Sequence, residues 1–118
     1  HWMPTTTGTG VVRWGFEYSV AKGHQQATGS VFPATTTVYV EQTISTASQW
    51  KHFVAEVSQA NAIPSTNVEP DTVIKMRIFR DAAHANDTYA GVVHAWQSDL
   101  HYQFNTLGTL NRAPNFYA

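Results

Sequence analysis

The sequence predicts an all-β protein whose strands form an antiparallel β-sandwich of the jelly-roll type. Apolar and polar residues alternate over Val11–Ala21, which is the periodicity of a strand. Threonine and aromatic residues are abundant, and both favour the pleated, half-buried surface of a sheet. No clear helical pattern separates the strand-like stretches, which excludes a doubly wound α/β fold.

The stretch Val11–Ala21 is the clearest strand of the sequence, because its two faces differ sharply in polarity when it is extended. One face carries Val12, Trp14, Phe16, Tyr18 and Val20, and the other carries Arg13, Gly15, Glu17 and Ser19. A helix would scatter these aromatic side chains around its circumference. Ahead of this strand, His1 and Trp2 have the character of a strand end that Pro4 interrupts.

The next strand is predicted over Thr35–Thr43, which is rich in β-branched residues. The stretch that follows, Ile44–Gln59, allows two interpretations. Its apolar residues Trp50, Phe53, Val54 and Val57 fit one face of a helix that Ser48 could cap. The same residues also allow a strand over Lys51–Val57. The alternation of the neighbouring stretches favours this strand.

Two further strands are predicted in the second half of the chain. Thr72–Arg80 alternates, with Ile74, Met76 and Ile78 opposite Lys75, Arg77 and Phe79. Tyr89–Phe104 is expected to form a long last strand, with an apolar face made of Val92, Trp96, Leu100, Tyr102 and Phe104. Polar stretches with turn-forming residues connect the strands; they are residues 22–33, 61–71 and 81–88.

These patterns lead to an expected core and an expected outer surface. We expect burial of Trp14, Phe16, Tyr18, Ile74, Met76, Ile78, Leu100 and Tyr102. The charged side chains of the same strands should face outward or into an interface; they are Arg13, Glu17, Lys75 and Arg77. A shift of the register by one residue would exchange the two sets.

The composition excludes several classes of partner. The net charge of −1 and the scattered basic residues argue against binding to nucleic acid or to an anionic membrane surface. No apolar stretch is long enough for membrane insertion. The chain has no cysteine, so disulfides and thiolate-bound zinc are excluded. Only 13% of the residues are charged, which suits a surface packed against protein neighbours.

The sequence contains no pattern that indicates an enzyme, a metal site or a cofactor. Its six histidines never occur in a ligand-like spacing, so we expect them to be ordinary surface or hydrogen-bonded residues. Asp81, Asn86 and Asp87 share a loop, but their spacing does not match a calcium-binding loop. A serine-nucleophile elbow is missing too. Glu17 and Glu56 could form a pair of catalytic carboxylates, but Glu17 belongs to the polar face, where a solvated charge is expected.

Trp50 is the best candidate for an exposed aromatic ring that stacks on a ligand, because polar residues flank it on both sides. Trp14 lies within an apolar face, where packing in the core is the expected role. We therefore name Trp50 and the nearby His52 as candidate ligand-binding or interface residues.

Several short motifs follow one another along the chain. They are His1-Trp2-Met3-Pro4, Val11-Val12-Arg13-Trp14 with Glu17-Tyr18-Ser19, Phe32-Pro33-Ala34-Thr35-Thr36, Met76-Arg77-Ile78-Phe79-Arg80-Asp81 and Asp99-Leu100-His101-Tyr102-Gln103. In this order, and over most of the chain, they resemble a group of tailed-bacteriophage virion proteins, described as structural or tail-fibre-like. The resemblance implies a β-sandwich held together by framework residues, and it suggests a salt-bridged corner formed by Arg77, Arg80 and Asp81.

The resemblance also implies a function and partners. We expect a virion structural protein, either a capsid decoration or a tail or fibre component, assembled in the bacterial host cytoplasm. Residues 1–118 would form a single β-sandwich domain that lacks N-terminal strands of the full-length protein. Open sheet edges would be covered by other virion proteins or by copies of the same chain, with a homotrimer as first choice. The alternative function is a carbohydrate-binding receptor-recognition module of a phage tail, which binds a host-surface glycan.

Overall fold

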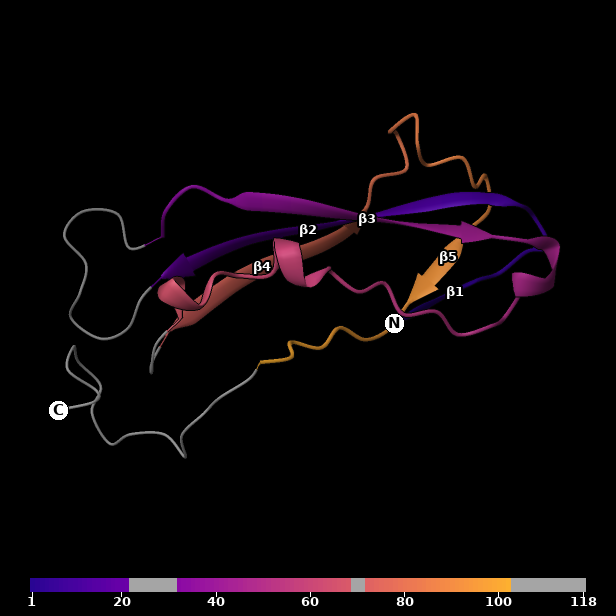
Figure 1. Ribbon diagram of the computed structural model, residues 1–118. Helices are drawn as coiled ribbons and strands as arrows, with labels where there is room; N and C mark the ends of the chain where they lie inside the picture. Colours follow the sequence, from indigo (N-terminus) through magenta and orange to yellow (C-terminus); the bar gives the residue numbers. More distant parts are fainter. Residues whose placement is uncertain (22–31, 69–71, 103–118) are drawn as a thin grey trace, which may run out of the picture.

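The computed structural model describes residues 1–21, 32–68 and 72–102. Within these residues, five strands form two antiparallel sheets, and the connections contain three short 3-10 helices (Figure 1). The predicted all-β fold with antiparallel sheets is therefore confirmed. In this part of the chain, no helix has the length and apolar character needed to cross a membrane.

The larger sheet has the order β3-β2-β4, with both pairings antiparallel. Its central strand is β2 (Gly10–Ala21), flanked by β3 (Thr36–Ile44) and β4 (Val73–Arg80). All three strands agree with the predicted ranges to within one residue at either end. Their alternating polarity explains this agreement, because such a pattern is stable only when one face of the strand is covered.

The smaller sheet pairs β1 (Trp2–Pro4) with β5 (Val93–Ala95). Beyond this pair, Trp2 exchanges two backbone hydrogen bonds with Phe53, at N–O distances of 3.0 and 2.8 Å. The strand expected around Trp2 is confirmed. Pro4 ends it, which fits a residue that cannot donate a backbone hydrogen bond.

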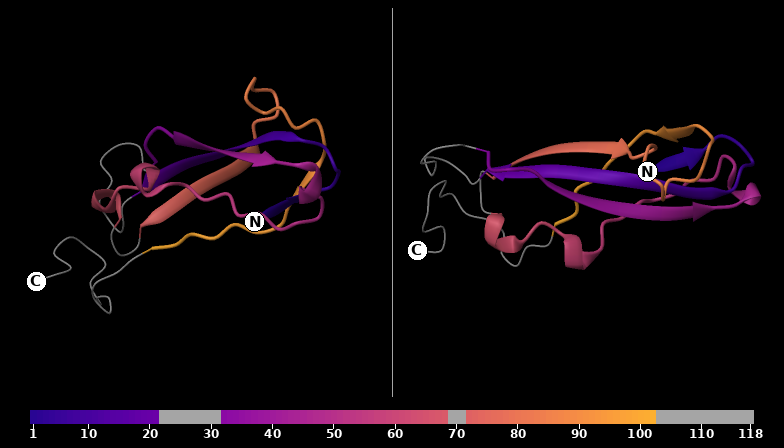
Figure 2. Two further views of the ribbon diagram at one scale, coloured as in Figure 1. Left: turned by 45° about the vertical axis from the view of Figure 1, so that its right-hand side comes forward. Right: turned by 90° about the horizontal axis from the view of Figure 1, so that it is seen from above.

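The core lies where the two sheets meet, and Trp2 is at its centre with 1% of its surface exposed. Its ring lies 5.5 Å from that of Trp14 and 5.1 Å from that of Phe53, measured between centroids. The indole N–H of Trp2 donates to Oε1 of Gln42 at 2.7 Å. As Figure 2 shows, β1 and β5 lie over one end of the larger sheet only, so the packed core is confined to that end.

The outer face of the larger sheet carries a row of aromatic and charged side chains. Gly15 lies opposite both Tyr39 and Phe79, whose rings meet edge to face at 6.3 Å. A Cβ at Gly15 would come within 2.3 Å of the Phe79 ring, so only glycine fits beneath it. The guanidinium groups of Arg13 and Arg77 lie over these two rings. The prediction that Trp14 and Arg13 lie on opposite faces of the sheet is therefore confirmed.

The segment Ile44–Gln59 forms neither of the expected elements. The structure has 3-10 helices at η1 (Thr46–Ser48) and η2 (Gln59–Asn61), and a third at η3 (Ser65–Asn67). The predicted strand over Lys51–Val57 is wrong, because only a bridge at Phe53 joins a sheet. Trp50 has a positive φ of 59°, which interrupts regular structure just before residues 51–57.

The long last strand over Tyr89–Phe104 is also wrong, since β5 covers only three residues of it. The phase differs too, because Val92 is exposed and Val93 packs against the core. Tyr89 is instead buried ahead of the strand, and Gly91 separates it from β5. Phe104 and most of the predicted loop over residues 22–33 lie outside the described residues.

The expected core is only partly confirmed. Trp14 is buried, and Phe16, Tyr18 and Ile74 are half-buried. Met76 is 42% exposed, Ile78 36% and Tyr102 75%, and Leu100 is exposed as well. The prediction fails for Met76 and Ile78 because the described part of the smaller sheet does not extend over this end of the larger one. It fails for Leu100 and Tyr102 because β5 ends at Ala95, so both residues lie beyond the paired strand.

Candidate functional site

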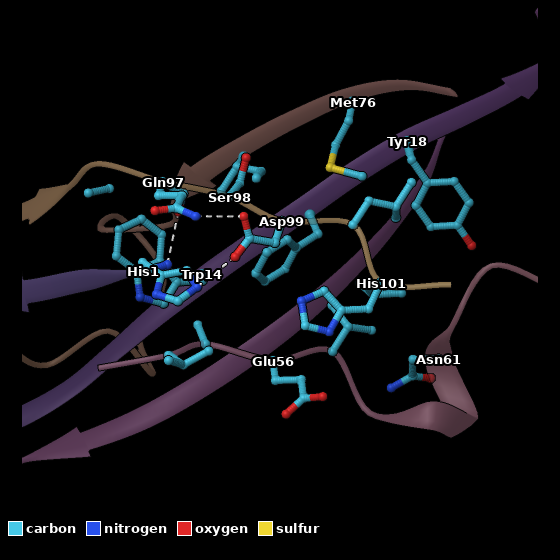
Figure 3. A pocket seen from close by; sticks show the side chains of 18 of the residues that line it. His1, Trp14, Tyr18, Glu56, Asn61, Met76, Gln97, Ser98, Asp99 and His101 are labelled. Atoms are coloured by element: carbon cyan, nitrogen blue, oxygen red, sulfur yellow. Dashed lines mark hydrogen bonds and ion pairs between the residues drawn. The ribbon is translucent and has the colours of Figure 1, made fainter. Parts of the chain in front are cut away.

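An open groove of about 530 Å³ lies on the part of the larger sheet that β1 and β5 leave uncovered (Figure 3). Its floor is the apolar face of the sheet, formed by Phe16, Tyr18, Val38, Met76 and Ile78. Two extended segments form its walls: residues 54–57, continuing to residues 61–63, and residues 97–101. The apolar face that the sequence predicted to be part of the core therefore forms the floor of a groove.

The rim of the groove is polar, in contrast to its floor. Side chains with oxygen or nitrogen atoms line the two walls, namely Glu56, Asn61, Gln97, Ser98, Asp99 and His101. A mainly apolar hollow with a few polar groups at its edge is the usual character of a binding site for a ligand or for a partner's side chains.

Trp14 lies at the covered end of the groove, where the core begins. Its indole N–H is buried and, among the described residues, meets no hydrogen-bond acceptor. An unsatisfied buried donor costs about 1–3 kcal/mol, so an acceptor atom brought by an occupant would be favourable there.

Two imidazole rings and a carboxylate form a chain of hydrogen bonds at the same end of the groove. Nδ1 of His1 lies 2.8 Å from Nε2 of His52, and Nε2 of His1 lies 2.9 Å from Oδ2 of Asp99. Gln97 donates to the other oxygen of Asp99 at 2.8 Å. We call the three residues His1, His52 and Asp99 the imidazole relay. Figure 3 shows His1 and Asp99 facing each other across it.

Aromatic stacking reinforces the relay. The His1 and His52 rings stack at 4.9 Å with an angle of 25° between their planes. The indole of Trp96 also packs on His52, with 5.3 Å between ring centroids and 43° between the planes, and Trp96 is 50% exposed. The result is a surface patch in which a half-exposed indole, two imidazoles and a carboxylate lie together.

Only one of the two candidate site residues named from the sequence belongs to the relay. His52 belongs to the relay, whereas Trp50 takes part in none of its contacts. Trp50 is 58% exposed, as expected, and its backbone N–H donates to the carbonyl of Pro4 at 2.9 Å. His1, Trp96 and Asp99 were missed, because residues so distant in the sequence meet only through the pairing of β1 with β5.

A second cluster of charges lies at the opposite end of the larger sheet from the open part of the groove. Arg80 donates to both carboxylate oxygens of Asp87, from Nε at 2.9 Å and from Nη2 at 2.5 Å. It also donates to the carbonyls of Tyr89 and Gly91. The backbone N–H of Arg13 donates to Asp87 at 3.0 Å. One arginine therefore holds the loop after β4 in place.

The expected salt-bridged corner of Arg77, Arg80 and Asp81 is wrong, because each of the three residues pairs with a residue outside the set. Asp81 accepts a hydrogen bond from Arg13 at 3.2 Å, and Arg77 donates to Glu17 at 2.9 Å. Arginine side chains bind both loop carboxylates, those of Asp81 and Asp87, and no three histidine or carboxylate side chains among the described residues are placed to hold a metal ion together.

The environment of Asp87 changes its titration. Only 1% of its side chain is exposed. Burial raises the pKa of this carboxyl, but the hydrogen bonds from Arg80 and from the Arg13 amide lower it more, so the pKa lies below its ordinary value. These groups are bonded to one another and have no free position for a substrate, so we regard the cluster as a structural element.

Comparisons with family models, with curated proteins and with solved structures found no match to this chain, so the assignment of a function depends on its own residues.

Proposed function

We propose that this chain is a structural component of a tailed-bacteriophage particle, a capsid decoration or a part of the tail or fibre. It acts through contacts with other virion proteins and with copies of itself, and it has no catalytic role. The open apolar groove carries this proposal, and the order of the sequence motifs supports it.

The groove supports a role in protein–protein contact because its floor is unusually apolar for a surface. Met76 and Ile78 stand in the middle of a sheet face and remain exposed among the described residues. Full burial of such a side chain contributes about 1.5–3 kcal/mol, so covering the exposed parts of both together contributes about 1–2 kcal/mol and favours the binding of a partner. Contiguous apolar patches of this kind mark interaction sites in soluble proteins.

The fold fits the same proposal. The sheet β3-β2-β4 would be one layer of a jelly-roll-like sandwich that extends over residues 1–118 as a single domain. Strands of a neighbouring copy or of another virion protein would complete the second layer over the groove. The low fraction of charged residues means that few charges lose their hydration when such a layer packs.

Substitution of the groove floor tests the proposal. We expect the double variant Met76→Glu, Ile78→Glu to be monomeric at micromolar concentration, where the unmodified chain associates, with a trimer as the expected mass. Two carboxylates on the floor would have to be buried without partners. Light scattering measures the mass directly.

The matched control is Lys75→Gln, Arg77→Gln, which makes the net charge more negative by the same two units on the opposite face of the same strand. It should associate like the unmodified chain. A monomeric mass for the unmodified chain, together with its absence from purified particles, would contradict the proposal.

A second candidate function is recognition of a host-surface glycan, and the patch beside the relay favours it. Trp96 offers the face of an indole on which the apolar side of a sugar ring can stack. Asp99 and Gln97 lie beside it and can accept or donate hydrogen bonds to hydroxyl groups.

We expect that, if a glycan binds, Trp96→Ala abolishes its binding on a glycan array, whereas Trp50→Ala leaves it unchanged. Loss of a stacking ring removes about 1–3 kcal/mol by analogy with stacked bases, a factor of about 5 to 150 in affinity. The reverse result would make Trp50 the ligand-binding ring, and no binding by the unmodified chain would exclude this candidate.

A further inference from the structure

The imidazole relay joins the two walls of the groove to each other through β1. His52 precedes the wall formed by residues 54–57, and Asp99 belongs to the wall formed by residues 97–101. His1 lies between them and bonds to both, and its amino group, a further positive charge beside the relay, donates to the carbonyl of Gln97 at 3.0 Å. The relay therefore adds side-chain contacts between two wall segments whose preceding residues also bond to the N-terminal segment through the backbone, Phe53 to Trp2 and Trp96 to His1.

Hydrogen-bond chemistry limits how many protons the relay can hold. Asp99 accepts, so Nε2 of His1 carries a hydrogen atom. In the neutral state Nδ1 of His1 accepts from Nε2 of His52, which accounts for their distance of 2.8 Å. One added proton keeps this geometry, because a single N–H can still lie between the two rings while Asp99 balances the charge.

A second proton does not fit. With both imidazoles charged, each of the two facing nitrogens carries a hydrogen atom, and neither can accept. The contact of 2.8 Å then becomes a repulsion between two like charges with only one carboxylate nearby. The stacked rings at 4.9 Å would have to separate, and the packing of Trp96 on His52 would be lost.

The other charged groups along the groove do not provide a second counter-charge inside the relay. Glu56 and His101 line the groove walls, and Lys51 precedes His52 in an exposed position. His94 is exposed on β5, where it lies opposite Met3. No ion pair to His1 or His52 from any of these four residues occurs among the described residues.

We propose that the imidazole relay is a proton-operated latch that holds the groove walls together at neutral pH and releases them in mild acid. The closed relay holds at most one added proton, whereas two separated imidazoles can hold two. Where the open form binds one proton more than the closed form, each unit by which the pH falls shifts the ratio of open to closed forms by up to tenfold. The opening and closing of the latch depends only on the geometry of the relay. Its role in controlling a docking surface rests on the proposed function.

Hydrogen exchange followed by mass spectrometry on the whole chain tests the latch between pH 8 and pH 5. After correction for the intrinsic effect of pH, we expect exchange in residues 51–57 and 96–101 to accelerate as the pH falls, by up to about tenfold per pH unit. Exchange in the central strand β2 should stay unchanged. The variant His52→Gln has one titrating ring fewer and should lose the acceleration.

Two further variants serve as controls. His84→Gln, in the loop after β4, and His101→Gln, in the groove but outside the relay, should both keep the acceleration of the unmodified chain. No acceleration in the unmodified chain would overturn the latch, as would acceleration that persists in His52→Gln. The measurement needs no partner. If exchange accelerates as expected but the chain never associates, the latch stands and only the proposed function is refuted.

Discussion

Replacing Trp2 with alanine is expected to lower the free energy of unfolding by about 3–5 kcal/mol, the range for truncating a buried aromatic residue. Trp2 is almost fully buried and packs against the rings of Trp14 and Phe53. It also accounts for the hydrogen bond to Gln42. The cavity would open between the two sheets, where few other side chains could move in.

Unfolding in urea, followed by circular dichroism, measures this loss. Trp96→Ala is the matched control, because the same side chain is removed from a half-exposed position. Its effect should remain below about 1 kcal/mol. Equal effects of the two substitutions would mean that the contact between the sheets contributes little to stability.

Replacing Asp87 with asparagine is expected to cost about 3–5 kcal/mol, because it leaves the buried guanidinium of Arg80 without its counter-charge. The asparagine has the same size, but its amide group would point two hydrogen atoms toward a donor. The backbone N–H of Arg13 would also keep only a weaker acceptor. Unfolding in urea again gives the magnitude.

The same residue predicts a dependence on pH. The pKa of Asp87 is lowered in the folded protein, so its contribution is complete above the pKa of the unfolded chain, about 3.9. It is lost as the pH falls through the lower, folded value. Melting temperatures between pH 7 and pH 2 should therefore fall less steeply below pH 4 in Asp87→Asn than in the unmodified chain.

Glu17→Gln provides the comparison for this experiment, because its partner Arg77 is largely exposed. Exposed ion pairs contribute about 0–1 kcal/mol, so this variant should follow the unmodified chain. If both variants show the same change of slope, the effect comes from the overall charge and not from the buried pair.

The strands of the larger sheet could be predicted from the sequence because each carries its own signal. In β2 every second residue is apolar over most of its length, and this local pattern is enough to define both the strand and its two faces. The same pattern could not predict how far the apolar face is covered. That depends on β1 and β5, which cover Trp14 but not Met76.

The imidazole relay could not be predicted from the sequence, because it also depends on how separate segments pack together. His1, His52 and Asp99 stand in three separate segments, and no spacing in the sequence relates them. The wrong prediction of a long strand over Tyr89–Phe104 also has a structural cause. Arg80 holds the carbonyls of Tyr89 and Gly91, and this turns the chain so that Val93, and not Val92, faces the core.

The pairing of β1 with β5 has a consequence for folding kinetics. Closing a loop costs more conformational entropy as the loop grows, and this pair joins residues 2–4 to residues 93–95. The pairing of β2 with β3 is more local and should form earlier. The chain would then pass through a stage in which the larger sheet exists but Trp2 has not yet covered it. Refolding yield should accordingly fall as protein concentration rises, because that bare sheet face can meet another chain before its own last strand arrives.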